Sequence, residues 1–272
     1  MRNTHYCGAI LLMFSFNQST IAGNMVVIPG GTFNMGCSKG DKFCETDEKP
    51  TIQVNVPVFL IDTKEVTVAE FRSCVSSGNC NAPKTHGRNK YCNYDAPKRD
   101  SHPVNCIDWA DAQTYCTLQG KRLPREAEWE KAARAGSSTP YAWGRSPSCK
   151  MAIANDGKTI GSVLGEMDGC GEDRTWSVAS RAPNAWGLYD MHGNVGEWVT
   201  NGYSPDALAH YARGNLNYAL KSDGKVIRGG SWDEKMNNLR ASFRNSKPPV
   251  SGEVVYGSVG FRCAMDAPAE MP

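Results

Sequence analysis

The chain has 272 residues, of which 30 are basic (Lys or Arg) and 28 are acidic, so its formal net charge is +2 at pH 7. This length is sufficient for one domain with a large buried core. The balanced charge, without a run of Lys or Arg, argues against a nucleic acid or an anionic membrane as a partner. We therefore expect a peptide, a glycan, a small molecule or another protein as the partner.

Residues 1–22 have the features of a secretory signal peptide. A basic start at Arg2 precedes a short apolar stretch over 7–16, and small residues follow near the expected cleavage point. The alternative is a buried first strand or helix, although nothing amphipathic continues it. No later stretch approaches the ~18–20 apolar residues of a membrane span. We predict an exported chain, periplasmic or secreted, with a domain over 23–265 and a flexible tail over 266–272.

Eleven cysteines are present, and ten remain once Cys7 is removed with the signal peptide. An even number of cysteines in an exported chain predicts disulfides, and the lack of a Cys-x-x-Cys pair argues against a zinc ribbon or a thioredoxin-type site. Short intervals favour local pairs of Cys37 with Cys44 and of Cys74 with Cys80. Spacing alone leaves the connectivity open.

Two stretches near the start of the mature chain are predicted to form strands. Residues 25–36 contain two short apolar runs around a Pro-Gly-Gly turn, which predicts a hairpin. Residues 52–61 alternate between apolar and polar side chains over most of their length, which predicts one further strand.

Two helices are predicted from capping residues and apolar spacing. The first begins near Thr67 and ends at Gly78, with Val68, Phe71 and Val75 on its inner face. The second begins after Asp108, whose side chain is expected to cap it. Its expected buried residues are Trp109, Ala112, Tyr115 and Cys116.

A third helix is predicted over residues 124–135, because acids come early in this stretch and bases come late. Trp129, Ala132 and Ala133 are expected to face the core. Turns and short strands are expected to dominate after Gly136. These elements together predict a single α+β domain with little regular secondary structure, in which disulfides hold the long loops.

The stretch 184–198 combines an acid, an amide and a second acid, Asp190, Asn194 and Glu197, with three glycines. Glycine lets the chain turn so that carbonyls and short acidic side chains converge. Converging oxygens are what Ca²⁺ prefers. The alternative is a tight turn whose acids cap backbone amides, and spacing alone does not decide between the two.

Several stretches resemble, in order and over nearly the whole mature chain, the formylglycine-generating enzyme (sulfatase-modifying factor) family. They are residues 25–36, 65–67, 102–104, 120–130, 141–144, 184–198, 228–232 and 260–263. The resemblance implies the single-domain, C-type-lectin-like fold of that family, stabilised by disulfides and by calcium.

The resemblance also implies two Ca²⁺ sites. The first would use the side chains of Asp190 and Glu197 with the carbonyls of Gly193 and Val195. The second would use the side chain of Asn155 and the carbonyl of Asp156, together with Asp168 and the carbonyl of Cys170. Calcium is therefore the expected cofactor, in a structural role.

One disulfide, Cys116 with Cys263, is implied by the resemblance, since both cysteines match a family pair that joins a helix to the C-terminal strand. The four remaining cysteines are then expected to pair with their neighbours. These pairs are Cys92 with Cys106, and Cys149 with Cys170 beside the second calcium site.

The chain departs from the family where its enzymes bind copper through two cysteines soon after Arg-Gly-Gly-Ser. Glu234 and Leu239 stand at about these two positions. A carboxylate and a leucine cannot replace the soft thiolates that select Cu(I), so bound copper and formylglycine formation are not expected. Gly196 stands where the family usually has an aromatic residue, which is expected to enlarge or loosen the groove.

Two functional hypotheses remain. The first is a binding or accessory module whose groove presents a polar surface with an aromatic anchor, although Trp232 could instead be buried. The groove residues would be Ser231, Trp232, Asn237, Asn238 and Arg240. The second is an oxidoreductase that acts without copper thiolates, as does a periplasmic siderophore-maturation oxidase of the family. Glu234, Asp233 and His192 would then transfer protons or hold a hard metal, unless they are only solvated or structural.

Overall fold

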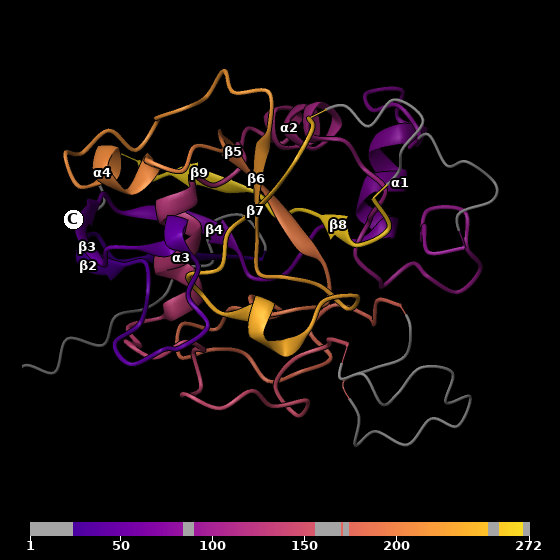
Figure 1. The fold of residues 1–272 in the computed structure, drawn as a ribbon. Helices are drawn as coiled ribbons and strands as arrows, with labels where there is room; N and C mark the ends of the chain where they lie inside the picture. The colour runs from indigo at the N-terminus through magenta and orange to yellow at the C-terminus, as the bar shows by residue number, and fades with distance from the viewer. Residues whose placement is uncertain (1–23, 84–89, 156–169, 171–173, 250–255, 269–272) are drawn as a thin grey trace, which may run out of the picture.

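The computed structural model describes residues 24–83, 90–155, 170, 174–249 and 256–268 (Figure 1). The predicted signal peptide lies outside these residues. Short strands and few helices are linked by long loops, with α1 and α2 together at one end of the molecule and α4 at the other. Within the described residues, no helix combines the length and apolar character needed to cross a membrane.

The first strands form an antiparallel ribbon instead of the predicted hairpin. β1 (Met25–Ile28) pairs with β4 (Phe59–Asp62), and β2 (Gly31–Met35) pairs with β3 (Ile52–Val56). The hairpin prediction was therefore wrong, and the single strand over 52–61 is divided into two. Pro57, which has no N–H for a ladder, interrupts that stretch. β9 (Ala264–Asp266) pairs with the other edge of β4, so the predicted tail begins inside a strand.

Besides the sheets β1-β4-β9 and β2-β3, a four-stranded sheet has the order β7-β6-β5-β8. Its strand β5 begins a few residues after Asp190. β5 (Gly196–Gly202) pairs antiparallel with β6 (Lys225–Arg228) and parallel with β8 (Val259–Gly260), while β7 (Asn245–Lys247) lies at the other edge. This sheet fixes Glu197 opposite Arg228 in the register.

The first two helices form as their caps predict. Thr67 and Glu70 form a capping box for α1 (Val68–Ser76), and Asp108 accepts a hydrogen bond from the amide of Asp111 at the start of α2 (Trp109–Leu118). One expected core residue is corrected, because Trp109 is only partly buried and donates its indole N–H to the Val199 carbonyl at 2.7 Å.

The third helix, α3 (Glu126–Arg134), is shorter than predicted, since Pro124 precedes its N-cap residue Arg125. Trp129, Ala132 and Ala133 are fully buried, as predicted. All nine residues of this helix are buried, including its acids and bases. Three short elements were not predicted: α4 (Ala207–Tyr211) and the 3-10 helices η1 (Thr46–Glu48) and η2 (Met236–Leu239).

All five expected disulfides are formed. They are Cys37–Cys44, Cys74–Cys80, Cys92–Cys106, Cys116–Cys263 and Cys149–Cys170. The pair Cys116–Cys263 links α2 to the residue before β9, so it closes the longest loop of the five. Together with the elements above, the disulfides confirm a single α+β domain with little regular secondary structure.

Candidate functional site

The turn over 184–198 is built from backbone conformations that bring it close to its neighbours. Asp190 and Asn194 have positive φ angles of 56° and 62°, and Gly193 has a φ of 100°. A Cβ on Gly193 would lie 2.2 Å from the Ile153 carbonyl oxygen, so a larger residue does not fit there. The turn thus places Glu197 in the interior and leaves Asp190 half-buried at the edge of a pocket.

Glu197 is fully buried, and two side chains donate hydrogen bonds to it. Its carboxylate accepts hydrogen bonds from Arg262 Nε and Nη2, both at 2.7 Å, and from Trp129 Nε1 at 2.8 Å. The Arg262 guanidinium is also fully buried, so this is an interior ion pair.

Two further acids, the half-buried Asp190 and the fully buried Glu65, lie near the same guanidinium. Asp190 accepts a hydrogen bond from the Ala179 amide at 2.6 Å, and burial raises the pKa of Asp190 to about 6. Burial and the neighbouring Asp190 raise the pKa of Glu65 well above its ordinary value. Asn194 donates to one oxygen of Glu65 at 3.2 Å, while the other, Oε1, has no hydrogen-bond partner among the described residues. The Arg262 guanidinium therefore faces three carboxyl groups. Glu65 and Glu197 are fully buried, whereas Asp190 is half-buried and also interacts with the Arg181 guanidinium.

This excess of acid suits a divalent cation with oxygen ligands. A buried group of carboxyls must either bind protons or be offset by positive charge. Within the described residues, no group of three or more His, Cys, Asp and Glu side chains is arranged to hold a metal by itself. The carbonyls of Gly193 and Val195 would therefore have to complete the first calcium site, as the resemblance implies. The donor chemistry fits, and calcium at this site stays a prediction.

The second predicted calcium site is only partly described. Asp156 and Asp168 lie outside the described residues. The backbone N–H of Asn155 donates to the Glu234 carbonyl at 2.9 Å. The Cys170 carbonyl already accepts a hydrogen bond from the backbone N–H of Ala154 at 2.9 Å. The structure therefore leaves this site as an expectation from the sequence.

The segment 228–245 carries the predicted groove residues, and its first part is buried. Ser231 is 1% exposed and Trp232 is 6% exposed. The indole of Trp232 donates to the Gly257 carbonyl at 3.2 Å and packs on Tyr91, with ring centroids 4.9 Å apart. The structural alternative for Trp232 is the one observed, so the groove has no exposed aromatic anchor at this residue.

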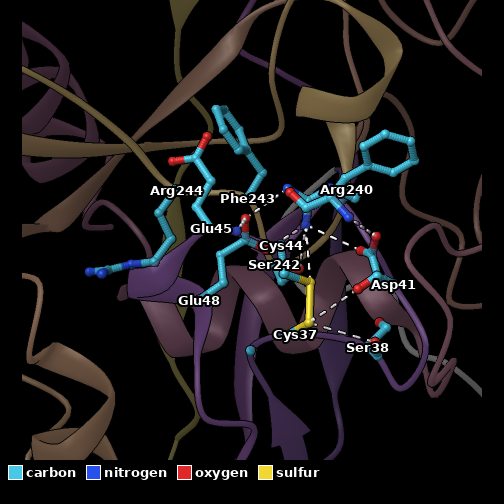
Figure 2. A network of polar contacts seen from close by, with 12 residues as sticks. Cys37, Ser38, Asp41, Cys44, Glu45, Glu48, Arg240, Ser242, Phe243 and Arg244 are labelled. Atoms are coloured by element: carbon cyan, nitrogen blue, oxygen red, sulfur yellow. Dashed lines mark hydrogen bonds and ion pairs between the residues drawn. A yellow bond between two sulfur atoms is a disulfide. The ribbon is translucent and has the colours of Figure 1, made fainter.

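Arg240 also lies in the interior and not on the groove. It is 2% exposed, and its Nη2 donates to Glu48 Oε1 at 2.7 Å and to the Phe43 carbonyl at 2.9 Å. Figure 2 shows that these contacts join the end of η2 to the N-terminal loop that contains Asp41. Arg240 therefore stabilises the fold and has little surface to offer a ligand.

Glu234 is a half-buried acid in this segment. Burial raises the pKa of Glu234, whose Oε1 accepts a hydrogen bond from Asn245 at 3.3 Å. Its Oε2 is buried without a hydrogen-bond partner among the described residues. Asp233 beside it is exposed, and Asn237 and Asn238 are half-buried. Leu239, at the second family cysteine position, is fully buried in the core.

His192 is buried with both ring nitrogens occupied. Its Nδ1–H donates to the Leu239 carbonyl at 2.6 Å, and Nε2 accepts from the Ala142 amide at 3.2 Å. Burial lowers the pKa of His192 to about 4, so the neutral ring is favoured at pH 7. With Trp143 and Asp190 it borders a small pocket of 170 Å³. This position suits a structural histidine better than a proton-transfer group.

We expect His192 to make the protein sensitive to acid. A histidine with a lowered folded pKa binds fewer protons folded than unfolded, so stability is lost as the pH falls from about 6.5 to about 4. The full loss is about 3 kcal/mol. His192→Asn, whose amide can still donate to Leu239, should flatten this slope in urea unfolding curves. His210→Asn, at a partly exposed histidine on α4, is the control, and an equal slope in both variants would contradict the assignment.

Two features of the site were not predicted correctly from the sequence. Glu65 was seen only as part of the family motif 65–67, and its place beside Asp190 follows from the fold. Gly196 does not widen a groove, because a Cβ there would lie 2.7 Å from Ile227 Cγ2, so the Ile227 side chain already fills that space.

The whole chain was compared with known proteins and families. Residues 13–267 match the family described as the sulfatase-modifying factor enzyme 1-like domain. A formylglycine-generating enzyme of Streptomyces coelicolor is 31% identical, and the match covers 89% of this chain and 89% of that protein.

Two solved structures have the same fold. PvdO from Pseudomonas aeruginosa superposes with a TM-score of 0.69 and 30% identity, covering 89% of this chain and 94% of that one. The Treponema denticola variable protein 1 has a TM-score of 0.64 at 20% identity, over 89% and 95% of the two chains, which shows a shared fold alone.

Proposed function

The chain belongs to the sulfatase-modifying factor enzyme 1-like family, and from this premise we propose that it is a binding or accessory module of the family and not a formylglycine-generating enzyme. The proposal rests on the residues that occupy the two positions where the family has its copper-binding cysteines. Glu234 offers a carboxyl group, and Leu239 is fully buried in the core. This pair lacks the soft ligands that hold Cu(I).

The surface near Glu234 supports a polar ligand. Exposed Asp233, half-buried Asn237 and Asn238, and the partly buried carboxyl of Glu234 offer both donors and acceptors. Such groups fix the orientation of a peptide, a glycan, a small molecule or the loop of a partner protein. Because Trp232 is buried, we expect hydrogen bonds to contribute more to affinity than an aromatic anchor.

Export and calcium are parts of the same proposal. Residues 1–22 support export to the periplasm or the outside of the cell. The excess of buried acid around Arg262 supports one structural calcium ion, held by Asp190 and Glu197.

A second proposal is an oxidoreductase of the family that works without copper thiolates. The raised pKa of Glu234 favours it, because burial makes this carboxyl group easier to protonate, and a protonated carboxyl group can donate a proton to a substrate. Asp233 and His192 support this proposal less, since one is exposed and the other has both ring nitrogens occupied.

The test that separates the two proposals is elemental analysis of the mature protein, exported under oxidising conditions and purified without chelators. Calcium without a redox metal is the expected result. Stoichiometric copper, iron or manganese would overturn the binding proposal in favour of the oxidoreductase.

A binding screen on peptide and glycan arrays then tests the surface itself. Glu234→Ala is expected to weaken a detected ligand about tenfold, or about 1.4 kcal/mol. Asp206→Ala, which removes an exposed carboxylate on α4, is the matched control and should not change the affinity. Equal affinities of the two variants would remove Glu234 from the binding surface.

A further inference from the structure

Among the described residues, a guanidinium lies beside one sulfur of the disulfide Cys37–Cys44 and beside no sulfur of the other four. Arg240 Nη1 lies 3.5 Å from Cys44 Sγ, and Figure 2 shows the disulfide and Arg240 side by side. Cys44 is 9% exposed, whereas Cys37 is half-buried and closes the same short loop from the outer side. One cysteine of the pair is therefore partly exposed, and the sulfur of the other lies next to the guanidinium of Arg240.

The remaining disulfides do not combine these two properties in the described part of the chain. Cys116 and Cys263 are both fully buried. Cys74–Cys80 closes a loop of similar length and has one half-buried sulfur, but no guanidinium contacts it among the described residues. Cys74–Cys80 is therefore an internal reference for accessibility and loop size.

A positive charge beside a sulfur stabilises its thiolate, and a more stable thiolate is the better leaving group in thiol–disulfide exchange. Two carboxylates share the same guanidinium. Glu48 pairs with Arg240 Nη2 at 2.7 Å, and Asp41 lies 3.2 Å from Nη1. Asp41 lies within the loop that the disulfide closes, so it competes with a Cys44 thiolate for the same nitrogen. Its position depends on the disulfide.

We propose that Cys37–Cys44 is a site of thiol–disulfide exchange with a dithiol protein, and that its reduction releases the loop over 37–44 from Arg240. A thiolate of the dithiol attacks Cys37 Sγ and forms a mixed disulfide, while the Cys37–Cys44 bond breaks and Cys44 leaves as a thiolate beside Arg240. The second thiol of the donor then displaces Cys37, which takes up a proton. The donor is oxidised to its disulfide, and two electrons pass to this chain.

The exchange would reach the proposed binding surface through Arg240. Its Nε donates to the Asn237 carbonyl at 2.7 Å, and its Nη2 donates to the Phe43 carbonyl at 2.9 Å. Opening the loop over 37–44 removes the contact of Arg240 with Phe43. Arg240 then keeps its hydrogen bond to Asn237 in η2 but no longer ties η2 to that loop. The effect on ligand binding rests on the function proposed above, whereas the exchange itself does not.

The exchange is tested on the whole mature protein with dithiothreitol as the probe. Free thiols are alkylated at timed intervals and assigned by mass spectrometry of peptides. We expect Cys37–Cys44 to be reduced about tenfold faster than Cys74–Cys80, because its leaving thiolate is stabilised. Equal rates, or a faster Cys74–Cys80, would overturn the proposal.

Two variants test the role of the charge. Asp41→Asn removes the competing carboxylate and should speed the reduction of Cys37–Cys44 about threefold. Arg240→Lys should slow it, and if that variant does not fold, Asp41→Asn alone decides. A rate unchanged by Asp41→Asn would contradict the charge argument.

Amide hydrogen exchange separates this proposal from the proposed function. In the reduced protein, the amides of Asn238 and Ala241, which donate to the Lys235 and Pro140 carbonyls, should lose protection. Unchanged protection with complete reduction would remove the link to η2, whatever the protein binds.

Discussion

Replacing Arg228 with Met is expected to lower the free energy of unfolding by about 4 kcal/mol. Arg228 is fully buried at the end of β6. Its Nη2 donates to Glu130 Oε2 at 2.6 Å, and Nη1 lies 3.6 Å from Glu126 Oε1. Methionine would fill much of the volume but would leave both acids with less positive charge nearby. Removing one partner of a buried ion pair costs more than the pair itself stabilises.

The same guanidinium satisfies the backbone that follows η2. It donates to the carbonyls of Ala241, Ser242 and Phe243. A buried carbonyl without a donor costs about 1–3 kcal/mol, so this loss adds to the loss of the ion pairs. The variant should therefore also loosen the segment that carries Glu234.

The measurement is urea unfolding of wild type and variant, with Arg72→Met as the matched control. Arg72 pairs with Asp100 at the surface, where both side chains are exposed by a third or more, so its loss should cost under about 1 kcal/mol. Adding Glu130→Gln to Arg228→Met should recover part of the loss. Similar costs for the Arg228 and Arg72 variants would contradict the importance of the buried network.

The difference between wild type and Arg228→Met should narrow in acid. Burial alone would raise the pKa of Glu126, but Arg244 and Arg228 together bring it below its ordinary value. A carboxyl group with a lowered folded pKa stabilises the protein above its unfolded pKa of about 4.3. This stabilisation is lost as the pH falls through the folded value, and the variant has less of it to lose.

The helices and the disulfides could be predicted because their signals are local or belong to the family. Thr67 and Asp108 cap the helices that follow them, and a cap acts within three residues. The hairpin over 25–36 could not be excluded, because a Pro-Gly-Gly turn is equally compatible with a bend in a longer ribbon. The partner strands of that ribbon lie later in the chain, and no local rule selects them.

The roles of the charged residues could not be predicted from sequence. In α3 the order of acids before bases indicates an exposed helix aligned with its dipole, but all nine residues are buried. Glu126 pairs with Arg244, and Glu130 pairs with Arg228, about a hundred residues later in each case. The second partner of Glu130, Arg134, lies one helical turn away and is local in sequence. Arg240 was assigned to a groove for the same reason, since its partner Glu48 is even more distant in sequence.

The proposed calcium site offers the other large expected effect. Removing calcium with EGTA should lower the melting temperature of the mature protein, because a ligand at a hundred times its dissociation constant stabilises by about 2.7 kcal/mol. Glu197→Gln should have a similar effect. That variant also weakens the buried ion pair with Arg262, so by itself it does not report on calcium.

Asp190→Asn distinguishes calcium binding from a purely structural role of Asp190, because the two roles predict opposite changes in the melting temperature without calcium. Without calcium, the variant removes one of three acids around Arg262, so its melting temperature should equal or exceed that of wild type. With calcium, wild type should gain stability and the variant should gain little. Asp206→Asn, at an exposed acid, should respond to calcium as wild type does. Equal melting of wild type with calcium and with EGTA would rule out the site. A variant that is less stable in both conditions would mean that Asp190 stabilises the turn through its bond to Ala179 and not through a metal.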